Sequence, residues 1–207
     1  MQENNLKHFL QLHFIVFIWG FTAILGKLIS IDSIPLVWYR MLLAILFVLL
    51  YFLIKKKRLT IDTKSLLKFI LTGTIIALHW IVFFEAIKVS TVSIALVTMS
   101  TGAFFTSLLE PLFFKRKIKT IEIVLGLIVI LGLYIIFSFE TQYALGIFYA
   151  LAASFLSAIF SVLNGLFVKR NDAEVISFYQ LLFGVLFVTV FLLFTNGFST
   201  EFFNLSG

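Results

Sequence analysis

The sequence predicts an all-α integral membrane protein, a polytopic bundle of about seven transmembrane helices. Its 207 residues are 61% hydrophobic and 13% charged, whereas a soluble domain is about 45–50% apolar and about 25% charged. The mean hydropathy is +1.12, and the apolar residues form near-continuous runs. Such runs favour membrane-spanning helices, because the strands of an outer-membrane barrel would alternate apolar and polar residues.

Seven stretches are long enough to cross the hydrocarbon of a membrane, which takes roughly 20 helical residues. They are Leu10–Ile29, Ile34–Ile54, Leu66–Ile87, Thr91–Phe114, Ile121–Phe139, Ala144–Val168 and Val175–Phe194. The first stretch is longer than the apolar core of a signal peptide, and no Ala-x-Ala cleavage site follows it. We therefore expect it to be a retained helix.

The links between these stretches are short, as at Ser30–Ser33 and Lys88–Ser90. Consecutive helices should therefore lie side by side and antiparallel. The sequence shows no Pro/Gly/Ser-rich linker between the stretches, and no soluble domain is predicted.

Basic residues gather at alternate links, and 13 of the 16 Lys and Arg share one side of the membrane if the N-terminus is cytoplasmic. They are Lys7, Lys55, Lys56, Lys57, Arg58, Lys64, Lys68, Lys115, Arg116, Lys117, Lys119, Lys169 and Arg170. The positive-inside rule then predicts a multi-pass protein of the inner (plasma) membrane with a cytoplasmic N-terminus. These loops also explain the pI of about 9.6. They lack the interleaved aromatic residues of a nucleic-acid interface, so no nucleic-acid partner is expected.

Residues 36–54 and 176–194 are similar when they are aligned without a gap. Six of the 19 positions are identical, and Tyr39-Arg40 aligns with Tyr179-Gln180. The offset of 140 residues equals five spans, so the two helices would cross the membrane in opposite senses. An inverted repeat of this kind is typical of secondary transporters that alternate access around a midplane site. The alternative is that two apolar helices match by chance.

Several short motifs over residues 14–138 resemble, in order and spacing, the EamA-type permeases of the drug/metabolite transporter superfamily. The motifs are Trp19-Gly20, Lys27, Pro35, Arg40, Ala44, Glu85-Ala86-Ile87-Lys88, Gly126 and Gly132. The resemblance implies a basket of ten helices, built from two five-helix EamA repeats with both termini cytoplasmic. It also implies a permease that exports small organic metabolites, such as amino acids, or drugs by alternating access.

The chain departs from the family pattern in three places. Ser100-Thr101-Gly102-Ala103 replaces a Pro early in the fourth span, and Lys115-Arg116 replaces a Gly-Glu after it. The third departure is that one complete repeat, residues 1–139, is followed by two helices of an inverted second repeat, residues 140–207. We therefore expect the chain to be inactive as a monomer, and to need either the missing C-terminal half or a homo-oligomer.

Three charged residues lie within the predicted spans near their outer ends: Lys27, Arg40 and Glu85. A charge in hydrocarbon costs roughly 2.5–3.5 kcal/mol on insertion scales, so each needs a partner or a polar cavity. One carboxylate can offset one cation, and the remaining positive charge favours an outward-facing vestibule for a carboxylate-bearing solute. The alternative is that Lys27 and Glu85 snorkel to the interface while Arg40 forms a structural pair.

Other polar and aromatic residues lie deeper in the spans. His79-Trp80 is near the midplane, where the His could exchange a proton and the Trp could line a cavity. The alternative is a core His that is hydrogen-bonded to a nearby carbonyl. Trp19 lies in mid-span, away from the aromatic belts of the interfaces. We predict that Trp19, Arg40, His79 and Trp80 border one common cavity.

Two further signals complete the predicted binding set. Asn164 lies inside a span and needs a partner there, and Tyr179-Gln180 aligns with Tyr39-Arg40 in the repeat. The full set of predicted substrate-binding residues is Trp19, Lys27, Arg40, His79, Trp80, Glu85, Asn164, Tyr179 and Gln180. In addition, Glu110-Pro111 is expected to kink or end the fourth span, because proline disfavours a helix at the residue before it.

The sequence predicts neither an enzyme nor a metal or other cofactor. It contains no Cys, and its three His are scattered, so it offers no thiolate nucleophile and no cluster of metal ligands. The function that the resemblance implies is a permease that works in the lipid bilayer on a small-molecule solute. The alternatives are a structural or assembly subunit that does not transport, and a truncated, inactive fragment of a transporter.

Overall fold

The computed structural model describes residues 2–138, 140–199 and 201–203, without the side chains of residues 2–5 and 201. These residues form helices and loops, and the described part contains no strand. The elements are α1 (Gln2–Leu28), α2 (Ser33–Lys55), α3 (Thr63–Val89), α4 (Val92–Met99), α5 (Gly102–Phe114), α6 (Thr120–Phe137), η1 (Thr141–Tyr143), α7 (Ala144–Phe167), α8 (Ala173–Phe194) and η2 (Glu201–Phe203).

Seven helical segments are long and apolar enough to cross a membrane, which confirms the all-α polytopic fold. Segments α4 and α5 together form the fourth span, and each of the other six long helices forms one. The expected ends agree with the observed ones to within a few residues, except that α1 starts eight residues before the expected Leu10. The expected end of the fifth span, Phe139, lies outside the described residues.

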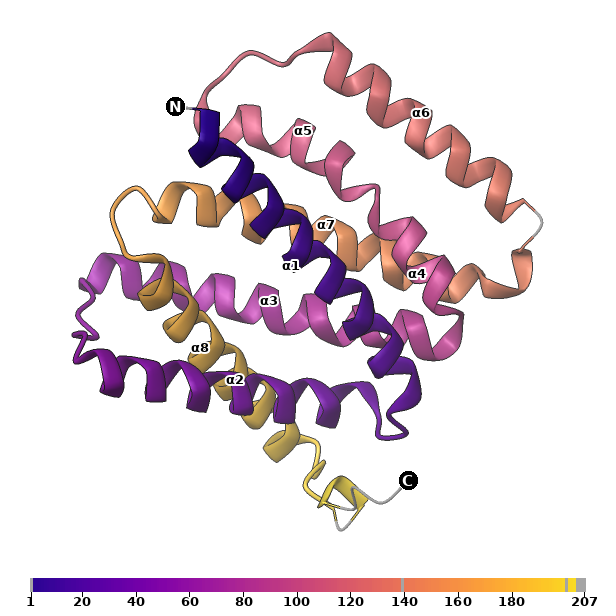
Figure 1. Cartoon of the computed structure of the whole chain (residues 1–207). Helices are drawn as coiled ribbons and strands as arrows, with labels where there is room; N and C mark the ends of the chain where they lie inside the picture. The colour runs from indigo at the N-terminus through magenta and orange to yellow at the C-terminus, as the bar shows by residue number, and fades with distance from the viewer. Residues whose placement is uncertain (1, 139, 200, 204–207) are drawn as a thin grey trace.

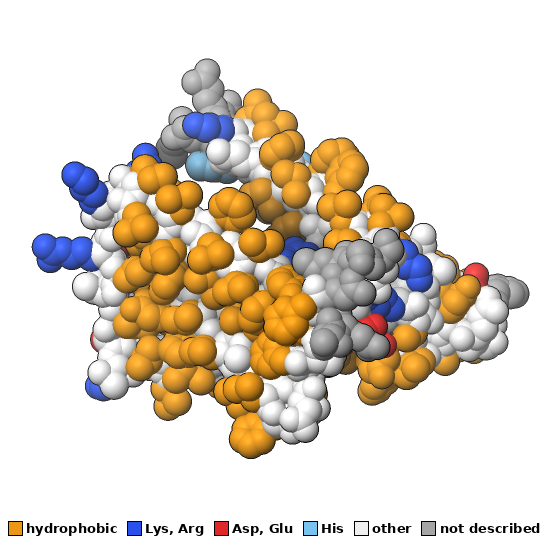
Figure 2. All heavy atoms as spheres, turned by 90° about the horizontal axis from the view of Figure 1, so that it is seen from below, with side chains coloured by type: hydrophobic (Ala, Val, Ile, Leu, Met, Phe, Trp, Pro, Cys, Tyr) orange, Lys and Arg blue, Asp and Glu red, His pale blue; other side chains and the backbone are white. Residues whose placement is uncertain are grey.

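Consecutive spans run antiparallel, as their short loops require (Figure 1). The loops α2–α3, α5–α6 and α7–α8 lie on the same side as the N-terminus, at the left of Figure 1, and the other loops lie on the right. The basic loops of the sequence therefore share one side of the bundle, and we continue to predict that this side is cytoplasmic. Apolar side chains cover most of the face seen in Figure 2, as contact with lipid requires.

Helix α3 is at the centre of the bundle and packs against α7, α8, α2 and α1. Small residues allow this close approach. Ala77 of α3 and Ala150 and Ala153 of α7 are fully buried, and a Cβ placed on Gly73 would lie 2.5 Å from the backbone oxygen of Gln180 in α8. Helix α1, by contrast, contacts α3 and α4 and leaves most of its apolar side chains exposed.

The fourth span is broken between Met99 and Gly102, which the sequence did not predict. Two hydroxyls there bond to main-chain oxygens of the preceding turn: Ser100 Oγ to Val97 at 2.7 Å and Thr101 Oγ1 to Thr98 at 2.7 Å. Such side-chain bonds compete with the main-chain helix bonds and bend helices. The hydroxyl of Thr101 also lies 2.9 Å from that of Ser154 on α7, which fixes the bend against the centre of the bundle.

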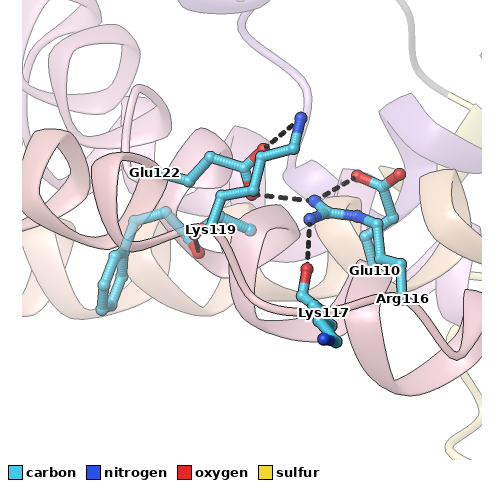
Figure 3. A network of polar contacts seen from close by, with 7 residues as sticks. Glu110, Arg116, Lys117, Lys119 and Glu122 are labelled. Atoms are coloured by element: carbon cyan, nitrogen blue, oxygen red, sulfur yellow. Dashed lines mark hydrogen bonds and ion pairs between the residues drawn. The ribbon is translucent and has the colours of Figure 1, made fainter.

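Pro111 does not end the helix, because α5 continues through it to Phe114. The end is set instead by Lys115, whose left-handed φ of 53° closes the last turn. Arg116 then joins the two neighbouring spans, since its Nη2 lies 3.1 Å from Glu110 and 2.8 Å from Glu122 (Figure 3).

Candidate substrate site

A pocket of about 610 Å³ lies between α1 and α2. Its walls are apolar side chains of both helices together with Phe84 of α3, and its polar groups come from Thr22, Tyr39 and Arg40. Arg40 is about two turns into α2, well inside the membrane-spanning segment. The site thus combines one permanent positive charge with a mainly apolar lining.

The guanidinium of Arg40 is held by aromatic rings. Its Cζ lies 4.0 Å from the ring centroid of Trp80 and 5.4 Å from that of Phe84, and these two rings stack with centroids 5.8 Å apart. Within the described part of the chain, Arg40 forms no ion pair with a carboxylate. Cation–π contacts stabilise a guanidinium, but they leave its in-plane N–H donors free for an anion.

His79 faces away from this pocket, although it is the neighbour of Trp80 in the sequence. It is buried, its Nδ1 lies 2.8 Å from the backbone oxygen of Ala153 in α7, and Phe83 and Phe160 surround its ring. This matches the alternative that the sequence left open for His79, a core His hydrogen-bonded to a nearby carbonyl. A role for His79 in binding stays a prediction.

The other two charged residues near the outer ends of the spans bond to neighbours rather than to Arg40. Lys27 Nζ lies 2.9 Å, 3.3 Å and 3.0 Å from the backbone oxygens of Ile87, Lys88 and Ser90, so it caps the end of α3. Glu85 accepts a hydrogen bond of 2.7 Å from the hydroxyl of Ser33. Glu85 therefore forms no ion pair that would offset the positive charge of Arg40.

Asn164 and Gln180 meet in a buried polar cluster that also contains Thr72. Gln180 Nε2 donates to Asn164 Oδ1 at 2.6 Å and to Thr72 Oγ1 at 2.9 Å, while the Thr72 hydroxyl donates to the backbone oxygen of Lys68 at 2.8 Å. The three side chains come from α7, α8 and α3. The two bonds of Gln180 Nε2 join α8 to α7 and to α3, and a role for Asn164 and Gln180 in binding stays a prediction.

The two tyrosines at aligned positions, Tyr39 and Tyr179, also link distant parts of the chain. Tyr39 of α2 donates to the backbone oxygen of Phe202, in the segment after α8, at 3.4 Å. Tyr179 of α8 donates to the backbone oxygen of Leu59, in the segment after α2, at 3.1 Å. Each helix thus reaches the segment that follows the other, which is the reciprocal pattern of a two-fold related pair.

Of the four residues expected around one cavity, Arg40 lines the pocket and Trp80 contacts Arg40, whereas His79 faces α7. Trp19 lies apart on α1, where it is 62% exposed. Sequence reasoning missed Phe84 as a wall of the pocket and Thr72 as the partner of Gln180. Thr72 could have been found, because it lies seven residues before His79 and so shares a face of α3 with it.

The seven apolar spans of the described residues, joined by short loops, define a polytopic membrane protein. A charged residue beside a pocket within such spans is typical of a transporter. A family model described as the EamA-like transporter family matches residues 9–138, which is more than half of the chain. The chain belongs to this family of membrane transporters. Searches of curated proteins and of solved structures gave no match.

Proposed function

We propose that this transporter exports small organic metabolites that carry a carboxylate, such as amino acids, across the plasma membrane. The observation that carries the proposal is Arg40, a guanidinium beside a mainly apolar pocket with no carboxylate paired to it in the described residues. Arg remains charged in proteins, so its position within the membrane favours an anionic partner. The apolar walls suit the remainder of such a solute.

We further propose that transport proceeds by alternating access around two inverted repeats. The reciprocal bonds of Tyr39 and Tyr179 support this reading, because they relate α2 and α8 as equivalent helices. Equivalence would make residues 1–139 a complete repeat and residues 140–207 the beginning of a second. The basic loops on one side of the bundle support a cytoplasmic N-terminus.

The working transporter, in this proposal, covers the exposed faces of α1 and α2 with further helices. Lipid cannot satisfy a guanidinium, so a pocket that holds Arg40 needs a protein boundary on the side of those faces. The helices come either from a longer chain or from a second copy. Efflux by the 207-residue chain should therefore fall steeply when it is diluted in liposomes, and a ten-span version should not show that fall.

The test measures efflux from proteoliposomes loaded with a mixture of amino acids and with their amides, which lack the carboxylate. We expect amino acids to leave and the amides to remain. Arg40→Gln should lower efflux about 10- to 150-fold, since a hydrogen bond to a charged group contributes about 1.5–3 kcal/mol. Arg58→Gln is the matched control, because Arg58 is exposed in a loop outside the spans.

Equal efflux of amides and amino acids would show that the transporter does not recognise the carboxylate. Wild-type efflux by Arg40→Gln would show that the pocket is not the site. A structural or assembly subunit, the alternative raised by the sequence, would give no solute-dependent efflux in either the 207-residue or the ten-span form.

A further inference from the structure

A second pocket, of about 760 Å³, lies between the beginning of α3 and the end of α7. Both helix ends are on the basic side of the bundle, at the left of Figure 1. The pocket is separate from the Arg40 pocket and shares no lining residue with it. The proposed transport of a solute does not use it.

The rim of this second pocket is strongly basic. Lys64 and Lys68 come from α3, Lys169 and Arg170 follow α7, and Asp62 is the acidic residue of the lining. The ammonium of Lys169 lies 4.6 Å from the ring centroid of Phe114. Lys64, Lys68 and Arg170 form no ion pair with any carboxylate in the described residues.

The carboxylate of Asp62 is engaged elsewhere. It accepts hydrogen bonds of 2.8 Å from the backbone N–H of Ser65 and of 2.7 Å from its hydroxyl, and so caps the N-terminus of α3. Asp62 keeps its negative charge, but this one carboxylate cannot offset Lys64, Lys68, Lys169 and Arg170 together. The rim therefore favours an anion.

The inner wall of the pocket is apolar. It is formed by Leu71 of α3 and by Leu163, Leu166 and Phe167 of α7, all of which belong to membrane-spanning segments. Leu71 is 59% exposed, so the apolar wall is continuous with the surface that contacts lipid. Cations at the ends of two spans, above an apolar wall that extends into the membrane, match the two parts of a phospholipid.

We propose that this pocket binds an anionic phospholipid of the leaflet on the basic side. The phosphodiester lies among Lys64, Lys68 and Arg170, and the first part of an acyl chain lies along Leu71 and Leu163. Basic pockets between transmembrane helices are suited to such headgroups. A soluble anion would use the rim but would leave the apolar wall without a partner.

The experiment uses the purified full chain in detergent and adds dioctanoyl phosphatidylglycerol, with dioctanoyl phosphatidylcholine and inorganic phosphate as separate arms. Native mass spectrometry counts bound lipid, and a titration gives the affinity. We expect phosphatidylglycerol to bind more tightly than phosphatidylcholine. Lys68→Gln with Arg170→Gln should weaken it about 30-fold, since each cation near the surface contributes about fivefold.

The matched control is Lys7→Gln with Lys117→Gln, which removes the same charge from exposed positions on the same side but outside the pocket. It should bind phosphatidylglycerol as the wild type does. Leu71→Trp should also weaken binding, without a change in charge, because it fills the apolar wall. Asp62→Asn keeps the helix cap and should bind at least as tightly as the wild type.

Several results would overturn the proposal. An equal loss in the pocket and control variants would show that net charge alone attracts the lipid. Equal binding of phosphatidylcholine would remove the role of the basic rim. Competition by inorganic phosphate as strong as that by phosphatidylglycerol, with no effect of Leu71→Trp, would assign the site to a free anion.

Discussion

Replacing Gln180 by Leu tests whether the buried polar cluster holds the second half of the bundle to the first. Gln180 is 3% exposed and Thr72 is fully buried. The substitution removes both Nε2 hydrogen bonds, at 2.6 Å to Asn164 and at 2.9 Å to Thr72. Leu and Gln have similar volumes, so little packing is lost.

The magnitude follows from the number of bonds. A side-chain hydrogen bond between transmembrane helices contributes about 0.6 kcal/mol on average and about 1.7 kcal/mol at most. Two bonds therefore predict a loss of about 1–3 kcal/mol in the free energy of unfolding. Thr72 keeps its bond of 2.8 Å to the backbone oxygen of Lys68, whereas Asn164 loses the donor to its Oδ1.

Reversible unfolding in mixed detergent micelles measures this free energy. The control is Ser177→Ala, because Ser177 is exposed on the same helix and bonds within it, to the backbone oxygen of Ala173. A double-mutant cycle with Thr72→Val should give a coupling of about 0.6–1.7 kcal/mol. Wild-type stability of Gln180→Leu, together with zero coupling, would refute the idea that this cluster joins the helices.

Three other changes have defined outcomes. Gly73→Leu should lower the free energy of unfolding by about 1–3 kcal/mol, because its Cβ would meet the backbone of α8. Gly20→Ala is the control, since the space around Gly20 is open, and it should not be destabilising in a thermal melt. Single Cys replacing Lys57 should be labelled by an impermeant reagent only from the cytoplasm, and Cys replacing Gln142 only from outside; the reverse would overturn the orientation. The hydrogen bonds from Ser65 hold the pKa of Asp62 below its usual range. The stabilisation of the α3 N-terminus by Asp62 is therefore present at neutral pH and is lost as the pH falls through the lowered pKa. Hydrogen exchange in the first turn of α3 should show this loss in the wild type and not in Asp62→Ala.

The sequence was sufficient to predict the number of spans and most of their ends. Long apolar runs set off by charged and polar links leave little choice, because a helix must satisfy its own main-chain groups in the membrane. The break at Met99–Gly102 was not predictable in the same way. It depends on the hydroxyls of Ser100 and Thr101 bonding back to the main chain and on Ser154 of a distant helix.

Depth in the membrane could be predicted from residue number, but the direction of each side chain could not. Lys27 and Glu85 lie near the span ends away from the basic loops, yet each bonds to a different partner, because α1 and α2 meet α3 on different faces. His79 and Trp80 are neighbours in the sequence and their rings are in contact, yet His79 bonds to α7 whereas Trp80 lies against Arg40. These side-chain directions depend on which helices surround α3, and that arrangement could not be predicted from the single sequence.

Arg40 and Gln180, which align at the offset of 140 residues, have different surroundings. The amide nitrogen of Gln180 donates to Asn164 of α7 and to Thr72 of α3. Under the offset of 140 residues, the counterpart of Asn164 in α1 is Ile24, which is apolar and exposed. Arg40 therefore has no polar partner of this kind at the aligned position of α1, and we propose that a solute or further helices supply an anion. If a solute supplies it, Arg40→Leu should abolish solute-dependent efflux and leave the unfolding free energy close to that of the wild type, whereas Gln180→Leu should do the opposite. Equal destabilisation by both substitutions would show that Arg40, like Gln180, is structural.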